Sequence, residues 1–278
     1  MNNSEIKALI TLLDDTDSSV YSTVGDKILS IGKEIIPFLE TEWETSFSPI
    51  VQERIENLIH LINLSTVKNK LYEWKNSSKQ DLLEGAFIVA SYQYPDLDKD
   101  ELEADICQLY YELWSHITEG MSTIDKIKSI NHVFFQQQKY SPNTKNFHSP
   151  KNSYINLVME TKKGNPITLC IIYLLITQRM GLSIYGVNLP NLFVLTYKDS
   201  EQQFYINVFN RGLIFSREDV ETYIGQLNKT PKEEYFSPCG NLDIIIRMIN
   251  TLIISYQKLN DEEKVIELQE LLTILTLD

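Results

Sequence analysis

The sequence predicts an α+β protein that is mostly helical, with a small antiparallel sheet in its second half. Apolar residues recur at helical spacing over most of the chain. Between residues 183 and 210, three short runs rich in β-branched and aromatic residues replace that spacing. The polar stretch KDSEQ separates the last two runs, as a hairpin turn would. A buried helix, three strands and a further helix are therefore expected in that order.

Composition and charge exclude several classes of function. The chain has 278 residues, 43% hydrophobic and 23% charged, which suits one large or two small globular domains. Its net charge is −13 and no basic cluster interrupts it, so we expect neither nucleic-acid binding nor attraction to an anionic membrane. No apolar run approaches the roughly 20 residues of a membrane span. The N-terminus lacks the basic region and cleavage site of a signal peptide, so the expected location is cytoplasmic.

The cysteines and the common motifs indicate no metal and no cofactor. Cys107, Cys170 and Cys239 are far apart and form no CxxC, which argues against a disulfide framework or a zinc site. A glycine-rich phosphate loop and the HExxH and GxSxG motifs are also missing. An acidic run begins at Asp96, but Glu101 and Cys107 stand where a calcium loop needs Gly and Glu.

Apolar residues at helical spacing predict a helical N-terminal unit over residues 1–75. Gly32 is expected to end one helix and Pro37 to begin the next. Two helices that meet at an Asp-rich turn resemble a HEAT-type repeat, and an ordinary helical hairpin is the alternative. Residues 76–228 would form the core domain that carries the sheet.

The core domain contains recognisable helix starts. Asp98 is a suitable N-cap with Glu101 three residues later, and Ser216 and Asp219 repeat this arrangement. Residues 229–278 form two helices around the turn NDEE, a pattern that resembles a single tetratricopeptide-type hairpin.

The stretch GNPITLCIIYLLITQRMGL, from residue 164 to 182, predicts a helix that is buried on most sides. Asn165 can cap it and Pro166 suits its first position. Almost no polar face remains from Ile167 onward, and Gly181 ends the helix. Cys170 lies four residues after Pro166, so the sequence places a thiol near a helix N-terminus.

Several stretches resemble the bacterial SirB-type transglutaminase-like family, which often carries a tetratricopeptide-like tail. GNPITL, RMGLSIYGVNLP and FNRG…SRED follow one another in the order of that family, and the resemblance covers about residues 80–278. It implies a transglutaminase-like core, with a buried helix against a small antiparallel sheet. In that class a thiolate at the first turn of the helix is paired with a His and an Asp on the strands.

This sequence departs from the family pattern at the residues that would carry catalysis. The family has LPGHF where this chain has LPNLF, and IDPFNGG where it has INVFNRG. The His and Asp positions are therefore Leu192 and Asn207. Cys170 lies one turn deeper than a thiol that uses the helix dipole, and it is surrounded by Ile and Leu. We therefore expect Cys170 to be a packing residue.

Three hypotheses of function follow. The first is a catalytically inactive transglutaminase-like protein that binds another protein as an interaction or regulatory module. The second is a hydrolase or acyl-transferase that uses Cys170, with His148 or His132 as a replacement base. The third is small-molecule binding in a remnant cleft. The polar candidates for that cleft are Asn165, Thr168, Asn188, Asn191, Asn207 and Asn210. The sequence does not specify a partner or an oligomeric state.

Overall fold

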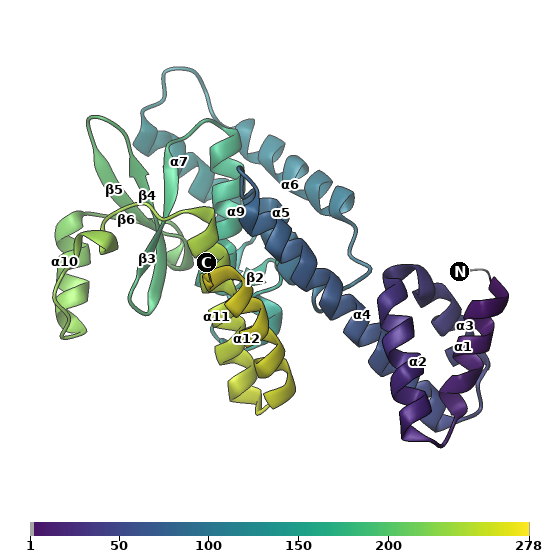
Figure 1. Cartoon of the computed structure of the whole chain (residues 1–278). Coiled ribbons are helices and arrows are strands. Elements are labelled where there is room, and N and C mark those ends of the chain that lie inside the picture. The colour runs from purple at the N-terminus through teal and green to yellow at the C-terminus, as the bar shows by residue number, and fades with distance from the viewer. Residues whose placement is uncertain (1–2, 278) are drawn as a thin grey trace. The chain divides into compact units, whose positions relative to one another are not determined.

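The computed structural model describes residues 3–277 and confirms an α+β protein in which helices predominate (Figure 1). The chain divides into two compact units, Met1–Lys70 and Leu71–Asp278. Each unit has its own core, so each is described by itself.

The first unit is entirely helical. It contains α1 (Asn3–Thr11), α2 (Ser18–Ile31), α3 (Ile36–Thr45) and the first part of α4 (Pro49–Asn76). Asp17 caps α2, and Gly32 ends that helix as expected, with a positive φ of 74°. One apolar cluster joins the four helices, and the residues that are fully buried in it include Leu13, Ile28, Ile35, Leu39 and Ile55. The HEAT-type repeat remains a prediction.

The second unit combines helices with a sheet. After the end of α4, its helices are α5 (Leu82–Ser91), α6 (Lys99–Trp114), α7 (Thr123–Asn131), α8 (Ile155–Thr161), α9 (Pro166–Arg179), α10 (Arg217–Gln226), α11 (Asn241–Leu259) and α12 (Glu262–Thr276). The predicted caps are confirmed. Asp98 accepts hydrogen bonds from the backbone of the first turn of α6, and Ser216 forms a capping box with Asp219 at α10.

The sheet contains four antiparallel strands in sequential order. They are β3 (Ile184–Leu189), β4 (Leu192–Lys198), β5 (Gln203–Asn207) and β6 (Leu213–Phe215). The three predicted strands are confirmed. The three-residue strand β6 was not predicted, because it is too short to show alternation; it follows a turn in which Arg211 and Gly212 both have positive φ. A parallel pair of two-residue strands, β1 (Ser141–Pro142) and β2 (Lys163–Gly164), was also not predicted.

The register of β3 and β4 determines which side chains share a face. Leu189 lies opposite Leu192, and Asn188 lies opposite Phe193. Because side chains alternate along a strand, these two pairs point to opposite faces of the sheet. α10 covers the face of Leu189 and Leu192, whereas α9 and α11 lie against the other face (Figure 1).

Helix α9 is buried along its length, as predicted. Every residue from Ile167 to Thr177 is buried. The Asn165 Oδ1 atom accepts a hydrogen bond from the Thr168 N–H at 3.0 Å, and Pro166 is the first helical residue. The helix contacts α6, α8, α11 and the first two strands of the sheet, which explains why it has no polar face.

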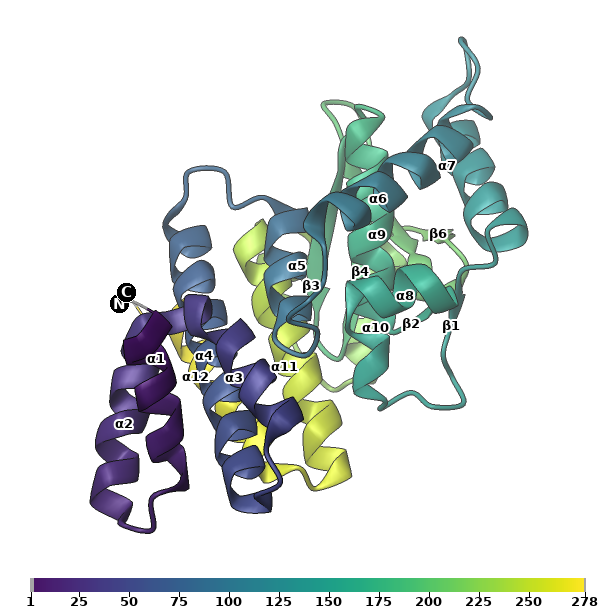
Figure 2. The same ribbon diagram turned by 90° about the vertical axis from the view of Figure 1, so that its right-hand side faces the viewer.

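Helices α11 and α12 form the predicted hairpin at the end of the chain (Figure 2). Asn260 ends α11 in the left-handed conformation, and Asp261 caps α12. The apolar side of α11 packs on α5 and α9. A separate hairpin domain over 229–278 and its tetratricopeptide type remain predictions.

Candidate functional site

Cys170 lies inside the core and not at a surface. Its side chain is completely buried on α9, and its Sγ atom is 3.8 Å from the Phe193 carbonyl oxygen. Burial raises the pKa of the Cys170 thiol far above its usual range, because a thiolate would lose its hydration there. A protonated thiol that solvent does not reach is a poor nucleophile.

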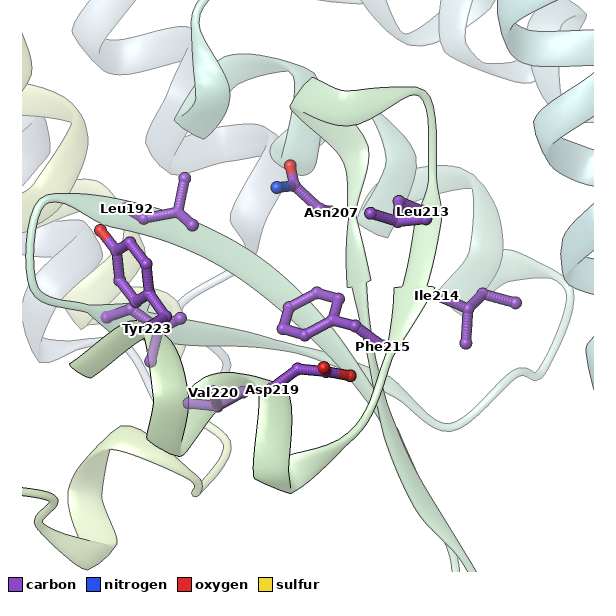
Figure 3. Close-up of a pocket in the computed structure, with 9 residues that line it drawn as sticks. Leu192, Asn207, Leu213, Ile214, Phe215, Asp219, Val220 and Tyr223 are labelled. Atoms are coloured by element: carbon purple, nitrogen blue, oxygen red, sulfur yellow. The ribbon is translucent and has the colours of Figure 1, made fainter. Parts of the chain in front are cut away.

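Leu192 and Asn207 lie on the α10 face of the sheet (Figure 3). Both line an apolar hollow of about 420 Å³, together with Phe215 and Tyr223. The Asn207 Oδ1 atom accepts a hydrogen bond from the Asn210 N–H at 3.0 Å, so this side chain stabilises a short 3₁₀ turn. Leu192 is half-buried against the apolar cluster of that face.

The fold therefore does not bring the Cys170 thiol together with Leu192 and Asn207, the positions of the family's His and Asp. Cys170 approaches Phe193 on one face of β4, and the neighbouring Leu192 points to the opposite face. Asn207 is on the side of Leu192. The sheet separates both positions from the thiol.

A second cavity opens at the N-terminus of α9 and is called here the α9–α11 cleft. Its volume is about 440 Å³. The residues that line it are Phe147, His148, Asn165, Pro166, Ile167, Asn188, Asn191, Phe193, Ile246, Arg247, Asn250, Thr251, Ile254 and Ser255. Apolar side chains and a few converging polar groups are the composition of many small-molecule sites.

Three of the asparagines singled out in the sequence line this cleft, and they differ in how deeply they are buried. Asn165 is buried, and its amide also donates to the Ser153 hydroxyl at 2.7 Å. Asn188 and Asn191 are exposed, and Asn191 occupies the left-handed region at the tip of the β3–β4 hairpin. Thr168 is buried behind the helix start, where its hydroxyl donates to the Ser153 carbonyl.

Neither of the two candidate histidines shares a cavity with the Cys170 thiol. His148 is exposed in the α9–α11 cleft, where its ring packs edge-on against Phe147. Cys170 does not line that cleft. His132 is exposed at the start of a π-helical turn that follows α7.

Arg247 is the cleft residue that sequence reasoning missed. Its Nη1 atom donates to the Asn188 Oδ1 atom at 3.0 Å, which ties α11 to β3. Burial lowers the pKa of Arg247 below its ordinary value, although a guanidinium stays charged at neutral pH. A signal was present: Arg247 is the one arginine of α11 and lies among the buried residues Ile244, Ile245 and Met248.

A sequence model of the transglutaminase-like superfamily matches residues 100–250, more than half of the chain. This protein therefore belongs to the transglutaminase-like superfamily. The buried helix against a small antiparallel sheet is the part of the fold that the match covers.

The similar curated proteins are mainly bacterial. A UPF0162 protein of Xylella fastidiosa (strain 9a5c) is 29% identical over 188 residues, which cover 64% of this chain and 66% of the relative. A UPF0162 protein of Vibrio cholerae is 23% identical over 177 residues, with 62% and 65% covered. The chain thus spans about two thirds of the length of these relatives.

A shorter similarity extends to a eukaryotic protein. Human F-box only protein 21 is 27% identical over 108 residues, 36% of this chain and 17% of that protein. No solved structure matches the chain. Among the residues that the structure describes, none of the helices is both long and apolar enough to cross a membrane.

Proposed function

We propose that this chain is a transglutaminase-like protein that has no thiol catalysis and acts by binding another protein. The observation that carries the first part is the position of Cys170, which is fully buried and separated by the sheet from Leu192 and Asn207. A cysteine enzyme needs an accessible thiolate within reach of a base.

Selective alkylation tests the absence of thiol catalysis. The folded protein is treated with iodoacetamide at neutral pH, and each cysteine-containing peptide is quantified by mass spectrometry. We expect Cys170 to stay unmodified until the protein is unfolded. The partly exposed Cys107 is the internal control and should react first. Rapid modification of Cys170 in the folded state would instead support the hydrolase or acyl-transferase hypothesis.

A hollow in the N-terminal unit supports the protein-binding part of the proposal. It has a volume of about 620 Å³ and is lined by Glu40, Trp43, Glu44, Glu56, Ile59 and His60. The Trp43 side chain is 39% exposed, and its indole N–H donates to Glu56. Acidic groups around an accessible indole suit a partner segment that carries basic and apolar side chains.

Matched aromatic substitutions test this surface. The full chain, Trp43→Ala and Phe47→Ala are immobilised, and proteins retained from a lysate of the native host are compared by mass spectrometry. Phe47 is fully exposed in the same unit but does not line the hollow. We expect a protein that the full chain and Phe47→Ala retain and Trp43→Ala loses. Identical retention by all three would remove the hollow from the proposal.

A second candidate function is small-molecule binding in the α9–α11 cleft. It is favoured by one observation: Asn165, Asn188 and Asn191 line a single cavity, next to a positively charged side chain. An amide group can both donate and accept hydrogen bonds, so such side chains can orient a polar ligand.

A further inference from the structure

The α9–α11 cleft contains a positive charge that no carboxylate balances. Among residues 3–277, Arg247 forms no ion pair, although the sequence has 38 acidic residues and 25 basic ones. Two other arginines of the same unit are paired: Arg217 lies 2.8 Å from Glu233, and Arg179 lies 3.4 Å from Glu103. Arg211 has no ion pair with a described residue either, but its side chain is exposed to water, whereas Arg247 is partly buried. A partly buried charge without a partner is costly, so its presence in a cavity is informative.

The nearest carboxylate along the helix is occupied elsewhere. Asp243 precedes Arg247 by one helical turn, a spacing at which acidic and basic side chains often pair. Its Oδ2 atom instead accepts a hydrogen bond from the Gly240 N–H at 3.0 Å and completes the start of α11. Apart from Asn188, no described residue is hydrogen-bonded to the guanidinium, so N–H groups remain for a ligand.

The surroundings of Arg247 define the chemistry of a ligand. The start of α9 lines the cleft, and its positive dipole end adds to the positive charge of Arg247. Asn191 and Asn250 supply neutral hydrogen-bonding groups, and the exposed parts of Phe147 and Ile254 supply apolar surface. No carboxylate is among the described residues that line the cleft, so the guanidinium suits a negatively charged ligand, and its planar fork matches a carboxylate.

We propose that the α9–α11 cleft binds a small carboxylate on an apolar body, about the size of an acylated dipeptide. The carboxylate pairs with Arg247, and the apolar body lies against Phe147 and Ile254. A volume of about 440 Å³ is within the range of small-molecule pockets. The inference deepens the second candidate function and rests on it, because it names the ligand class of that cleft.

Calorimetric titration with a matched pair of probes tests the inference. The probes are N-acetyl-Leu-Leu with a free carboxylate and the same peptide with a C-terminal amide. We expect the acid to bind the full chain at least tenfold more tightly than the amide. Arg247→Met keeps the apolar stem but removes the charge, and should weaken binding of the acid at least tenfold. Lys258→Met removes an exposed charge from the same helix and should change neither affinity.

The outcomes separate the ligand class from the cleft itself. Circular dichroism checks that Arg247→Met is folded, and the comparison of acid with amide on the full chain needs no variant. Equal affinity for both probes would overturn the carboxylate and leave ligand binding in place. Binding of neither probe at millimolar concentration would overturn the inference. Inorganic phosphate that binds in an Arg247-dependent manner, with no binding of the acid, would overturn it in favour of a different anion.

Discussion

The two faces of the sheet differ in what their side chains can do. On the α10 face, Leu192 and Asn207 border an apolar hollow that contains no cation among its lining residues. On the opposite face, Cys170 is sealed in the core, and the α9–α11 cleft beside it contains Arg247. The family positions that suggest catalysis are thus on one face, and the polar cleft is on the other. Two neighbouring residues of one strand belong to different sites.

This difference shows that adjacent residues of one sequence motif can lie on opposite faces of a sheet, so a motif alone does not place its side chains in one site. The resemblance to the family makes Leu192, in the stretch LPNLF, the counterpart of a histidine that pairs with the thiol. In the structure, Phe193 packs toward α9 while Leu192 packs toward α10. A base at position 192 and a thiol at position 170 would lie on different sides of the sheet.

The largest expected effect is on stability, when the adjacent residues Leu192 and Phe193 are each replaced by alanine. Phe193 is completely enclosed, so Phe193→Ala should lower the free energy of unfolding by about 3–5 kcal/mol. Leu192 is half-buried, and Leu192→Ala should cost about 1–2 kcal/mol because less apolar surface is lost. Urea unfolding measures both values. Similar costs for the two variants would contradict the assignment of these side chains to unequal environments.

The pH dependence of stability should report on the sealed thiol. The pKa of the Cys170 thiol is raised in the folded state. Below the pKa of an unfolded thiol, about 8.5, the thiol is protonated in both states, and burying it costs no extra free energy. Above that pH the unfolded chain loses the proton first, and stability should fall by up to about 1.4 kcal/mol per pH unit. Urea unfolding between pH 8 and 9.5 should show a shallower decline for Cys170→Ala than for the wild-type chain.

The control for this measurement is internal. Burial also raises the pKa of Cys239, to about 12, but that residue is present in both proteins and its contribution cancels. Identical slopes for the wild-type chain and Cys170→Ala would mean that the Cys170 thiol ionises as readily in the folded state as in the unfolded chain.

A smaller effect is expected at the tip of the β3–β4 hairpin. The Tyr223 hydroxyl donates to the Pro190 carbonyl at 2.9 Å and ties α10 to this tip. Tyr223→Phe should cost about 1 kcal/mol of unfolding free energy, because the carbonyl loses its partner. Tyr185→Phe is the matched control on β3, where the side chain is exposed, and should be nearly neutral. A neutral Tyr223→Phe would show that this hydrogen bond does not stabilise the hairpin.

The smallest expected effect is on activity. The double substitution Leu192→His and Asn207→Asp restores the family residues but places both on the α10 face. We expect no Cys170-dependent hydrolysis of p-nitrophenyl acetate, because no imidazole reaches the thiol. Combining the pair with Cys170→Ala separates background hydrolysis by histidine from thiol chemistry. Hydrolysis that disappears with Cys170→Ala would contradict the separation of the two faces.

Features with a local cause could be predicted from the sequence. Asn165 and Pro166 start α9, and Ser216 and Asp219 start α10, because capping involves only neighbours in the chain. The three longer strands were recognisable from their composition. The strand β6 was not, since three residues are too few to show alternation, and it is pairing with β5 that defines the strand.

The candidate site was less accessible to sequence reasoning. Asn188 and Arg247 are 59 residues apart, and only the packing of α11 against β3 brings them together. The apolar neighbours of Arg247 make it unusual in the sequence, but they do not show that its charge is unbalanced, because Asp243 stands at a spacing that favours an ion pair. Only the capping of α11 by Asp243 leaves Arg247 without a carboxylate.

By itself, the sequence determined the α+β class, the helix starts and the burial of α9, since periodicity and capping depend on short-range geometry. It also carried the resemblance to the transglutaminase-like class. The tertiary structure alone decided that Cys170 and Leu192 lie on opposite sides of the sheet, because strand register assigns every side chain to a face. It also decided that Arg247 enters a cleft, because the environment of a charge depends on which helices and strands pack around it.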